Sequence, residues 1–179
     1  MANIIGNNFW EGSLSVVQAI YNDVDLGKTT QDTTIEYKED IKDILFHQDG
    51  TQPADKIRTG AAWQVSLTFG EIDTTLVTSL LYGTTASGTG ESVKLSRELY
   101  RSGKTSESKE LILKKVDSEG TVSTDPKQWL TFYSAMPQVT GSFAHGADTQ
   151  REIEITFYCF FDSTNTAFGY SGNASSLGL

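Results

Sequence analysis

Two segments with strict alternation of apolar and polar residues, at the two ends of residues 33–69, constrain the fold more than any other feature of the chain. Ile35 and Tyr37 alternate with polar neighbours, and residues 63–69 repeat the pattern. A period of two predicts β-strands with one packed and one solvated face. The turn-rich segment between them, residues 49–60, is longer than a tight hairpin needs. We therefore expect a long hairpin with a charged loop that serves for contact.

Further short segments along the chain are predicted as strands, some by alternation and that of residues 109–117 by its strongly apolar centre. They lie in residues 13–20, 93–100, 109–117, 128–136 (ended by Pro137) and 151–162. Residues 21–32 are predicted as a turn region, and residues 73–83 carry the only helical spacing. The chain is therefore predicted to be mainly β, an antiparallel β-sandwich or barrel with one short α-helix, a long hairpin loop and extended terminal arms.

The length of 179 residues fits a single domain, residues 1–179. Its expected parts are an N-terminal arm (1–13), a β-sandwich core (14–162) and a C-terminal arm (163–179). The first arm carries apolar residues without periodicity, which we expect to pack against another surface, of the same subunit or of a neighbour. These candidate inter-subunit residues are Ile4, Ile5, Phe9 and Trp10. The chain has neither a signal-peptide pattern nor an apolar run of about 18–20 residues, so folding in a cytoplasm without a membrane is expected.

The charge balance and the cysteine usage exclude two classes of protein. A net charge of -9 opposes nucleic-acid binding through phosphate neutralisation, although DNA can pass a surface that does not bind it. A single cysteine, Cys159, excludes an intrachain disulfide framework, and its apolar surroundings predict a buried thiol.

No catalytic or cofactor-binding pattern stands out. The phosphate-loop spacing after Gly83 has Thr89 where lysine is required, and His47 and His145 lie far apart without partners at ligand spacing. Turns or a solvated strand face explain the remaining acidic candidates, which are Asp117 with Glu119, Asp162 with Asn165, and Glu152 with Glu154. We therefore expect no enzymatic activity, no metal site and no cofactor.

If the alternating strands share one sheet, their polar faces form a net acidic wall. The expected wall residues are Glu36, Lys38, Gln64, Ser66, Thr68, Glu152, Glu154 and Thr156. The expected packed residues are Ile35, Tyr37, Trp63, Val65, Leu67, Ile153, Ile155 and Phe157. Such a half-solvated antiparallel sheet leaves edges that can pair between copies, and a closed ring would turn the acidic faces inward.

The order of the elements carries a resemblance. Residues 24–29 follow an early strand, Gly60 leads into the strand of residues 61–69, Glu71 begins a short helix, and residues 131–139 and 152–162 form a final hairpin. Over residues 14–162, this arrangement resembles the tail tube (major tail) proteins of long-tailed bacteriophages.

The resemblance implies a structural virion protein of hexameric rings that stack into a tail tube, through which double-stranded genomic DNA passes without specific binding. It implies assembly in the host cytoplasm into the virion tail. The implied partners are further copies, a tape measure protein, a tail terminator and a baseplate or tip. The loop would reach the adjacent ring through His47, Asp49, Asp55, Lys56 and Arg58. Contractile and non-contractile tails remain equally compatible.

Two alternatives stay open at this point. One is another virion β-sandwich, a baseplate or head-decoration protein that forms a closed oligomer. The other is a carbohydrate-binding β module, which needs an aromatic platform. Its candidates are Trp10, Trp63 and Trp129.

Overall fold

The chain forms one large antiparallel sheet. The computed structural model describes residues 9–10, 16–44, 55–70, 78, 80, 84–86, 93–95, 108–139 and 152–177. The strand order is β2 (Val24–Lys28), β1 (Val17–Tyr21), β7 (Lys109–Lys115), β8 (Trp129–Val139), β9 (Ile153–Cys159), β4 (Asp55–Phe69) and β3 (Thr34–Ile44). Strand β10 (Gly169–Ser171) pairs with β8 outside this order, and β5 (Thr84–Ala86) pairs with β6 (Val93–Leu95). The described residues include two 3-10 helices, η2 (Pro126–Gln128) and η3 (Ala174–Leu177). The predicted mainly β, antiparallel class is confirmed.

The sheet curls around a single core. Thr29 bridges to Phe69, which joins the end of β2 to the end of β4, and the Thr30 amide donates to the Thr68 carbonyl at 2.8 Å. Across the core, the rings of Tyr21 and Phe157 lie 5.4 Å apart. Strands from opposite parts of the sheet therefore face each other, and their apolar side chains exclude water between them.

Alternation places the core residues as the sequence predicts. Burial alternates along β1, β7, β9 and the second half of β4. Of the predicted packed face, the buried residues are Val65, Leu67, Ile153, Ile155 and Phe157, while Ile35 and Trp63 are partly buried. Tyr37 is 44% exposed, because it lies where β3 leaves the body.

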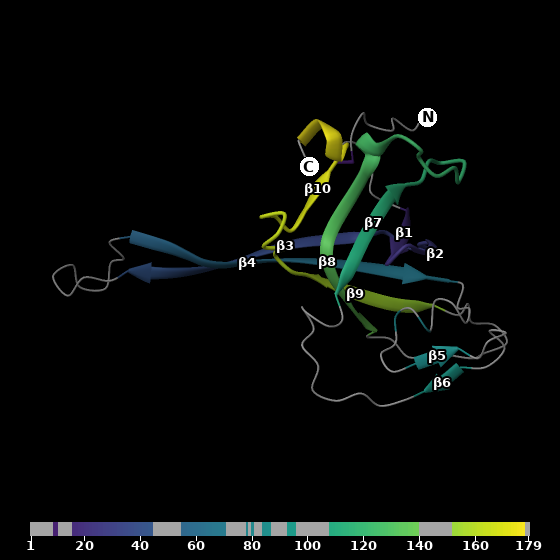
Figure 1. Ribbon diagram of the computed structural model, residues 1–179, viewed down its shortest axis with the longest axis horizontal. Coiled ribbons are helices and arrows are strands. Elements are labelled where there is room, and N and C mark those ends of the chain that lie inside the picture. Colours follow the sequence, from purple (N-terminus) through teal and green to yellow (C-terminus); the bar gives the residue numbers. More distant parts are fainter. Residues whose placement is uncertain are drawn as a thin grey trace.

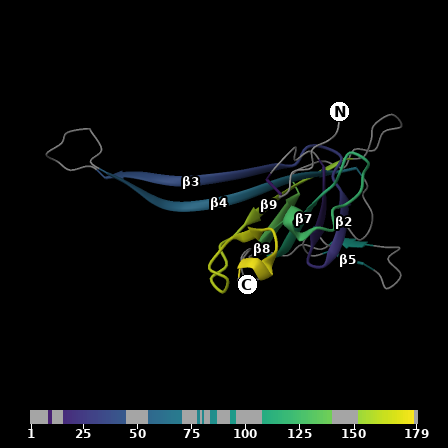
Figure 2. The ribbon, with the colours of Figure 1, turned by 90° about the horizontal axis from the view of Figure 1, so that it is seen from above.

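Strands β3 and β4 leave the body together as a long projection (Figures 1 and 2). β4 pairs with β9 only from Trp63 onward, whereas β3 remains paired with β4 up to Ile44. We call the two-stranded part, residues 38–44 and 55–62, the arm. None of its side chains is buried.

The arm corrects the predicted loop. Residues 55–60, expected in a loop, lie on β4, and the strand contains a bulge at Thr59 between the pairs Asp40–Gly60 and Ile41–Arg58. Backbone pairing continues here without apolar alternation, because no core lies beneath the strands. Residues 45–54 lie outside the described part of the chain.

Three further expectations differ from the structure. The region 21–32 contains strand β2, reached through a tight turn in which Asn22 and Asp23 have φ values of 51° and 64°. β8 continues through Pro137, because from Met136 onward its only paired neighbour among the described strands is β9. Residues 163–177, expected in an extended arm, include β10 on β8 and helix η3.

The predicted α-helix falls largely outside the described residues. Thr78 and Leu80 have helical backbones, and Leu80 is buried. Within the described part of the chain, no helix is long and apolar enough to span a membrane.

Candidate functional site

The predicted polar wall exists as one continuous surface, because β3, β4 and β9 are neighbours. Ser66 pairs with Thr34 on one side and Thr156 on the other, and Thr68 pairs with Glu154. Residues two apart on a strand share a face. The register therefore brings together Glu36, Lys38, Gln64, Ser66, Thr68, Glu154 and Thr156. Glu152 directly precedes β9 and accepts a hydrogen bond from Gln31 Nε2 at 2.7 Å.

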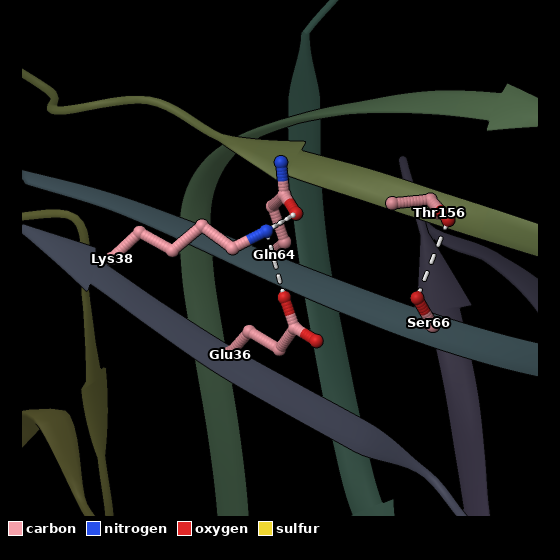
Figure 3. Close-up of polar contacts among 5 residues, drawn as sticks. All are labelled: Glu36, Lys38, Gln64, Ser66 and Thr156. Carbon is pink, nitrogen blue, oxygen red and sulfur yellow. Dashed lines mark hydrogen bonds and ion pairs between the residues drawn. The ribbon is translucent and has the colours of Figure 1, made fainter.

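The side chains of this wall satisfy one another (Figure 3). Lys38 Nζ lies 2.9 Å from Glu36 Oε2 and donates to Gln64 Oε1 at 2.9 Å. The hydroxyl oxygens of Ser66 and Thr156 lie 3.3 Å apart, and either can donate. Lys38, the one cation predicted here, is thus neutralised by a neighbouring carboxylate, and the surface offers mainly carboxylates, amides and hydroxyls.

Strand β8 extends the wall, which the sequence interpretation missed. Gln138 pairs with Thr156, and Met136 pairs with Tyr158, so both lie on the same face as the wall residues. The sequence predicts that the strand ends at Pro137, although the alternation continues beyond it. On the opposite side, Asp40 and Lys42 continue the face outward along the arm.

The other face of the arm is neutral through ion pairs between strands. Lys56 Nζ lies 3.2 Å from Asp43 Oδ1, and Arg58 Nε lies 3.1 Å from Glu39 Oε2. The Tyr37 hydroxyl donates to Glu39 Oε1 at 2.6 Å, and this hydrogen bond raises the pKa of Tyr37. Of the residues predicted for an inter-ring loop, Asp55, Lys56 and Arg58 therefore lie on the ladder of the arm, whereas His47 and Asp49 lie outside the described residues.

Aromatic side chains gather where the arm meets the body. The rings of Trp10 and Trp63 lie 6.4 Å apart, and those of Tyr37 and Trp63 lie 4.7 Å apart. Phe9, predicted for an inter-subunit arm, is instead fully buried in the core of its own chain. Trp10 remains 48% exposed, and Ile4 and Ile5 lie outside the described residues.

Trp129 does not join these rings in one platform. Its indole Nε1 donates to the Ser123 carbonyl at 2.9 Å, and Lys114 Nζ lies 4.2 Å from its ring centre. The three tryptophans therefore do not form one sugar-binding platform, because Trp129 contacts Ser123 and Lys114 instead of the other two rings.

The acidic turns use their carboxylates locally. Asp117 Oδ1 accepts from the amides of Glu119 and Thr121 at 2.9 and 2.6 Å. Asp162 accepts from the amides of Thr164 and Asn165, both at 3.2 Å. Among the described residues, no group of three or more His, Cys, Asp or Glu side chains is placed to hold a metal ion.

Cys159 lies at the end of β9 and is buried. Burial raises the pKa of its thiol to about 12, because the apolar core disfavours the thiolate. At neutral pH the group is therefore a protonated core side chain.

Comparison with known proteins gives weak structural likenesses. No protein-family model and no curated protein matches the chain. The tube-terminating cap of the anti-feeding prophage has a TM-score of 0.46 and 15% identity, over 97% of this chain and 100% of that chain. A sheath/tube terminator of the PVC extracellular contractile injection system has a TM-score of 0.42 and 15% identity, over 80% and 88% of the chains. A sheath–tube complex from such a system has a TM-score of 0.40 and 15% identity, over 81% and 84%. Likeness at this level does not assign the chain to a family.

Proposed function

We propose that the protein is a structural subunit that assembles with its own copies into the tail tube of a virion or a tail-like particle. The single observation that carries this proposal is the arm, which extends the sheet beyond its core and has no partner on either face among the described residues. A surface of this kind is completed by another molecule.

The energetics of the arm support this proposal. A two-stranded ladder without a packed face is only marginally stable in water. Its ion pairs Lys56–Asp43 and Arg58–Glu39 have exposed members, and such pairs contribute about 0–1 kcal/mol. The ladder is therefore weakly stabilised by its own contacts, and contact with another subunit would stabilise it further.

The sheet edges supply a second route to assembly. β2 and β3 are the outer strands of the described sheet, and an open edge can pair with the edge of another copy. Edge pairing around an axis closes a ring, and we propose six copies. In this arrangement the wall face lines a channel, and the arm reaches the next ring.

The chemistry of the wall suits passage of double-stranded DNA. Glu36, Glu152 and Glu154 outnumber Lys38, which is already paired with Glu36. Phosphates bind proteins mainly through lysine and arginine. A net acidic, hydroxyl-rich channel would therefore let DNA slide without retaining it.

Electron microscopy of the purified protein over a range of concentrations tests the assembly. Tubes or stacked rings are expected, with sedimentation showing growth of the largest species with concentration. Discrete particles of one size would instead support a closed oligomer such as a baseplate or head-decoration protein. A monomer at all concentrations, with and without preformed tube ends as nuclei, would contradict the proposal.

The channel assignment has its own test. Reversing the charge of the wall with Glu152→Lys and Glu154→Lys should leave tubes intact but slow genome release, because phosphate would then find cations. Unchanged release from particles with intact tubes would place this face outside the channel.

A further inference from the structure

An aromatic groove lies at the base of the arm, with buried core residues such as Phe132 at its floor and exposed rings at its rim. Its volume is about 380 Å³, and its walls come from the N-terminal residues, β4, β8 and residues 161–171. Its rings come from Trp10, Trp63, Phe132, Phe161, Phe168 and Tyr170. None of the described residues that line it carries a charge. The groove is therefore suited to an apolar side chain on a neutral surface.

The rim of the groove exposes large apolar groups to solvent. Trp10 is 48% exposed, and Phe161, stacked edge-on against Phe168 at 5.7 Å, is 44% exposed. Tyr37, beside Trp63, extends the same apolar surface onto the base of the arm. Contiguous exposed apolar surface of this kind marks an interaction site.

The remaining large exposed apolar residues of the described chain lie on the arm itself. Ile41 is 54% exposed and Ile57 is 51% exposed. The register puts them on opposite faces of the ladder, because Ile41 pairs with Arg58 and Ile57 pairs with Lys42.

The two faces of the arm differ in their charge. On the Ile41 face, the carboxylates of Glu39 and Asp43 are both paired with cations of β4. The Ile57 face continues the polar wall, with Asp40 and Lys42 beside it. Removing water from the first face costs less, because its charges already have partners.

The groove and the Ile41 face cannot meet within one chain. Ile41 lies four residues beyond Tyr37, about 13 Å farther along a continuous strand. Both views show the arm projecting away from the body (Figures 1 and 2). Bringing Ile41 back to Trp63 would require breaking the ladder of β3 and β4, so the two surfaces are complementary only between copies.

We propose that the aromatic groove is the acceptor site for the Ile41 face of a second copy's arm. This inference rests on the proposed function, because it names the contact through which copies associate. The contact joins two different surfaces, so each added copy leaves one free arm or one free groove. A heterologous contact of this kind propagates into an open stack unless the rotation between copies closes a ring.

A pair of matched variants tests the face. Ile41→Glu should raise the critical concentration for polymerisation at least about tenfold, because a carboxylate would enter the neutral groove. Ile57 is similarly exposed but lies on the opposite face of the same ladder. Ile57→Glu should therefore change the critical concentration by less than about twofold. Circular dichroism of both variants checks that the sheet is intact.

Cross-linking tests the acceptor directly. Copies with Ile41→Cys, mixed with copies carrying Phe161→Cys, should form a covalent dimer on mild oxidation. Copies with Ile57→Cys should not form one with the same partner. The buried native Cys159 keeps the background low.

The outcomes separate this inference from the proposed function. If the unaltered protein assembles but Ile41→Glu and Ile57→Glu have equal effects, or if both cysteine pairs cross-link equally, the groove assignment is wrong while self-assembly stands. If the unaltered protein never assembles, the proposed function fails, and the groove assignment fails with it. Both the proposed function and the groove assignment are supported if Ile41→Glu alone weakens polymerisation and only the pair of Ile41→Cys with Phe161→Cys cross-links.

Discussion

β4 is one continuous strand with two unlike halves. From Trp63 to Phe69 it pairs with β9, and as far as Ser66 also with β3, and its burial alternates as in any half-buried strand. From Asp55 to Ala62 its only partner among the described strands is β3, and it has no buried side chain. The backbone ladder therefore extends past the end of the core, so one half of the strand stabilises the fold and the other half remains free for contact.

The largest difference between the two halves is expected in thiol reactivity, which Cys159 reports at their boundary. Cys159 pairs with Trp63, and its pKa is raised from 9.0 to about 12, which lowers the thiolate fraction about a thousandfold at a given pH. We expect the native protein to resist a thiol reagent, while Thr59→Cys on the arm reacts at the rate of a free thiol. Absorbance of the released chromophore measures both, and equal rates would contradict the burial difference.

The same shift predicts a dependence of stability on pH. In the unfolded chain the thiol ionises near 9.0, whereas in the folded chain it ionises only near 12. Its contribution to the free energy of unfolding is therefore complete below pH 9 and is lost as the pH rises toward 12. Cys159→Ala should lack this part of the alkaline slope in urea titrations.

Truncating a core residue of β4 should cost far more stability than truncating an arm residue. Leu67 is fully buried, and Leu67→Ala should lower the free energy of unfolding by about 2–5 kcal/mol through lost burial and a cavity. Ile57→Ala on the arm should change it by less than about 0.5 kcal/mol. Urea unfolding followed by tryptophan fluorescence measures both. Comparable losses would mean that the arm belongs to the same cooperative core.

Substitution of one glycine in the body and one on the arm should also differ in its effect on stability. A Cβ at Gly169 would collide with the Thr131 carbonyl oxygen, so Gly169→Ala should separate β10 from β8 and cost about 1–3 kcal/mol. A Cβ at Gly60 would lie 3.2 Å from Asp40 Oδ2, the end of a side chain that can move. Gly60→Ala should therefore be nearly neutral. Thermal unfolding of the two variants tests the difference, which disappears if β10 is not packed on β8.

A small effect is also expected for the ion pairs of the arm. Arg58 and Glu39 form an exposed pair, and Arg58→Ala should lower stability by less than about 1 kcal/mol. That loss should shrink further in 1 M salt, where the screening length is about 3 Å. A larger, salt-independent loss would show that Arg58 packs against the body and does not act through charge alone.

Where side chains alternate over a core, the sequence was enough to predict the structure. Val65, Leu67, Ile155 and Phe157 were assigned to the packed face from their spacing alone, and they are buried. The polar wall follows from the same periodicity, because a strand that buries one face must present the other. The wall is continuous because β3, β4 and β9 are neighbours in the sheet.

The elements that the sequence does not predict are those whose side chains mostly do not pack on the core, so their sequences show no apolar alternation. The sequence predicts a loop for the distal β4 because its charged residues do not alternate with apolar ones. In the structure these charges pair across the strands, as Lys56 does with Asp43. β2 escaped notice because Leu26 is its only buried residue. The aromatic groove joins Trp10, Trp63 and Phe161, which are distant in sequence and show no common spacing.

The continuity of β4 also has a mechanical consequence. A pull on the arm runs along the backbone from Asp55 directly into the segment paired with β9. The hydrogen bonds of an antiparallel ladder lie perpendicular to the strands, so tension along β4 shears all the bonds from Trp63 to Phe69 together. They would have to fail collectively, and not one after another as in a zipper. A subunit tethered by its arm would therefore resist axial stretching with the strength of its whole central sheet.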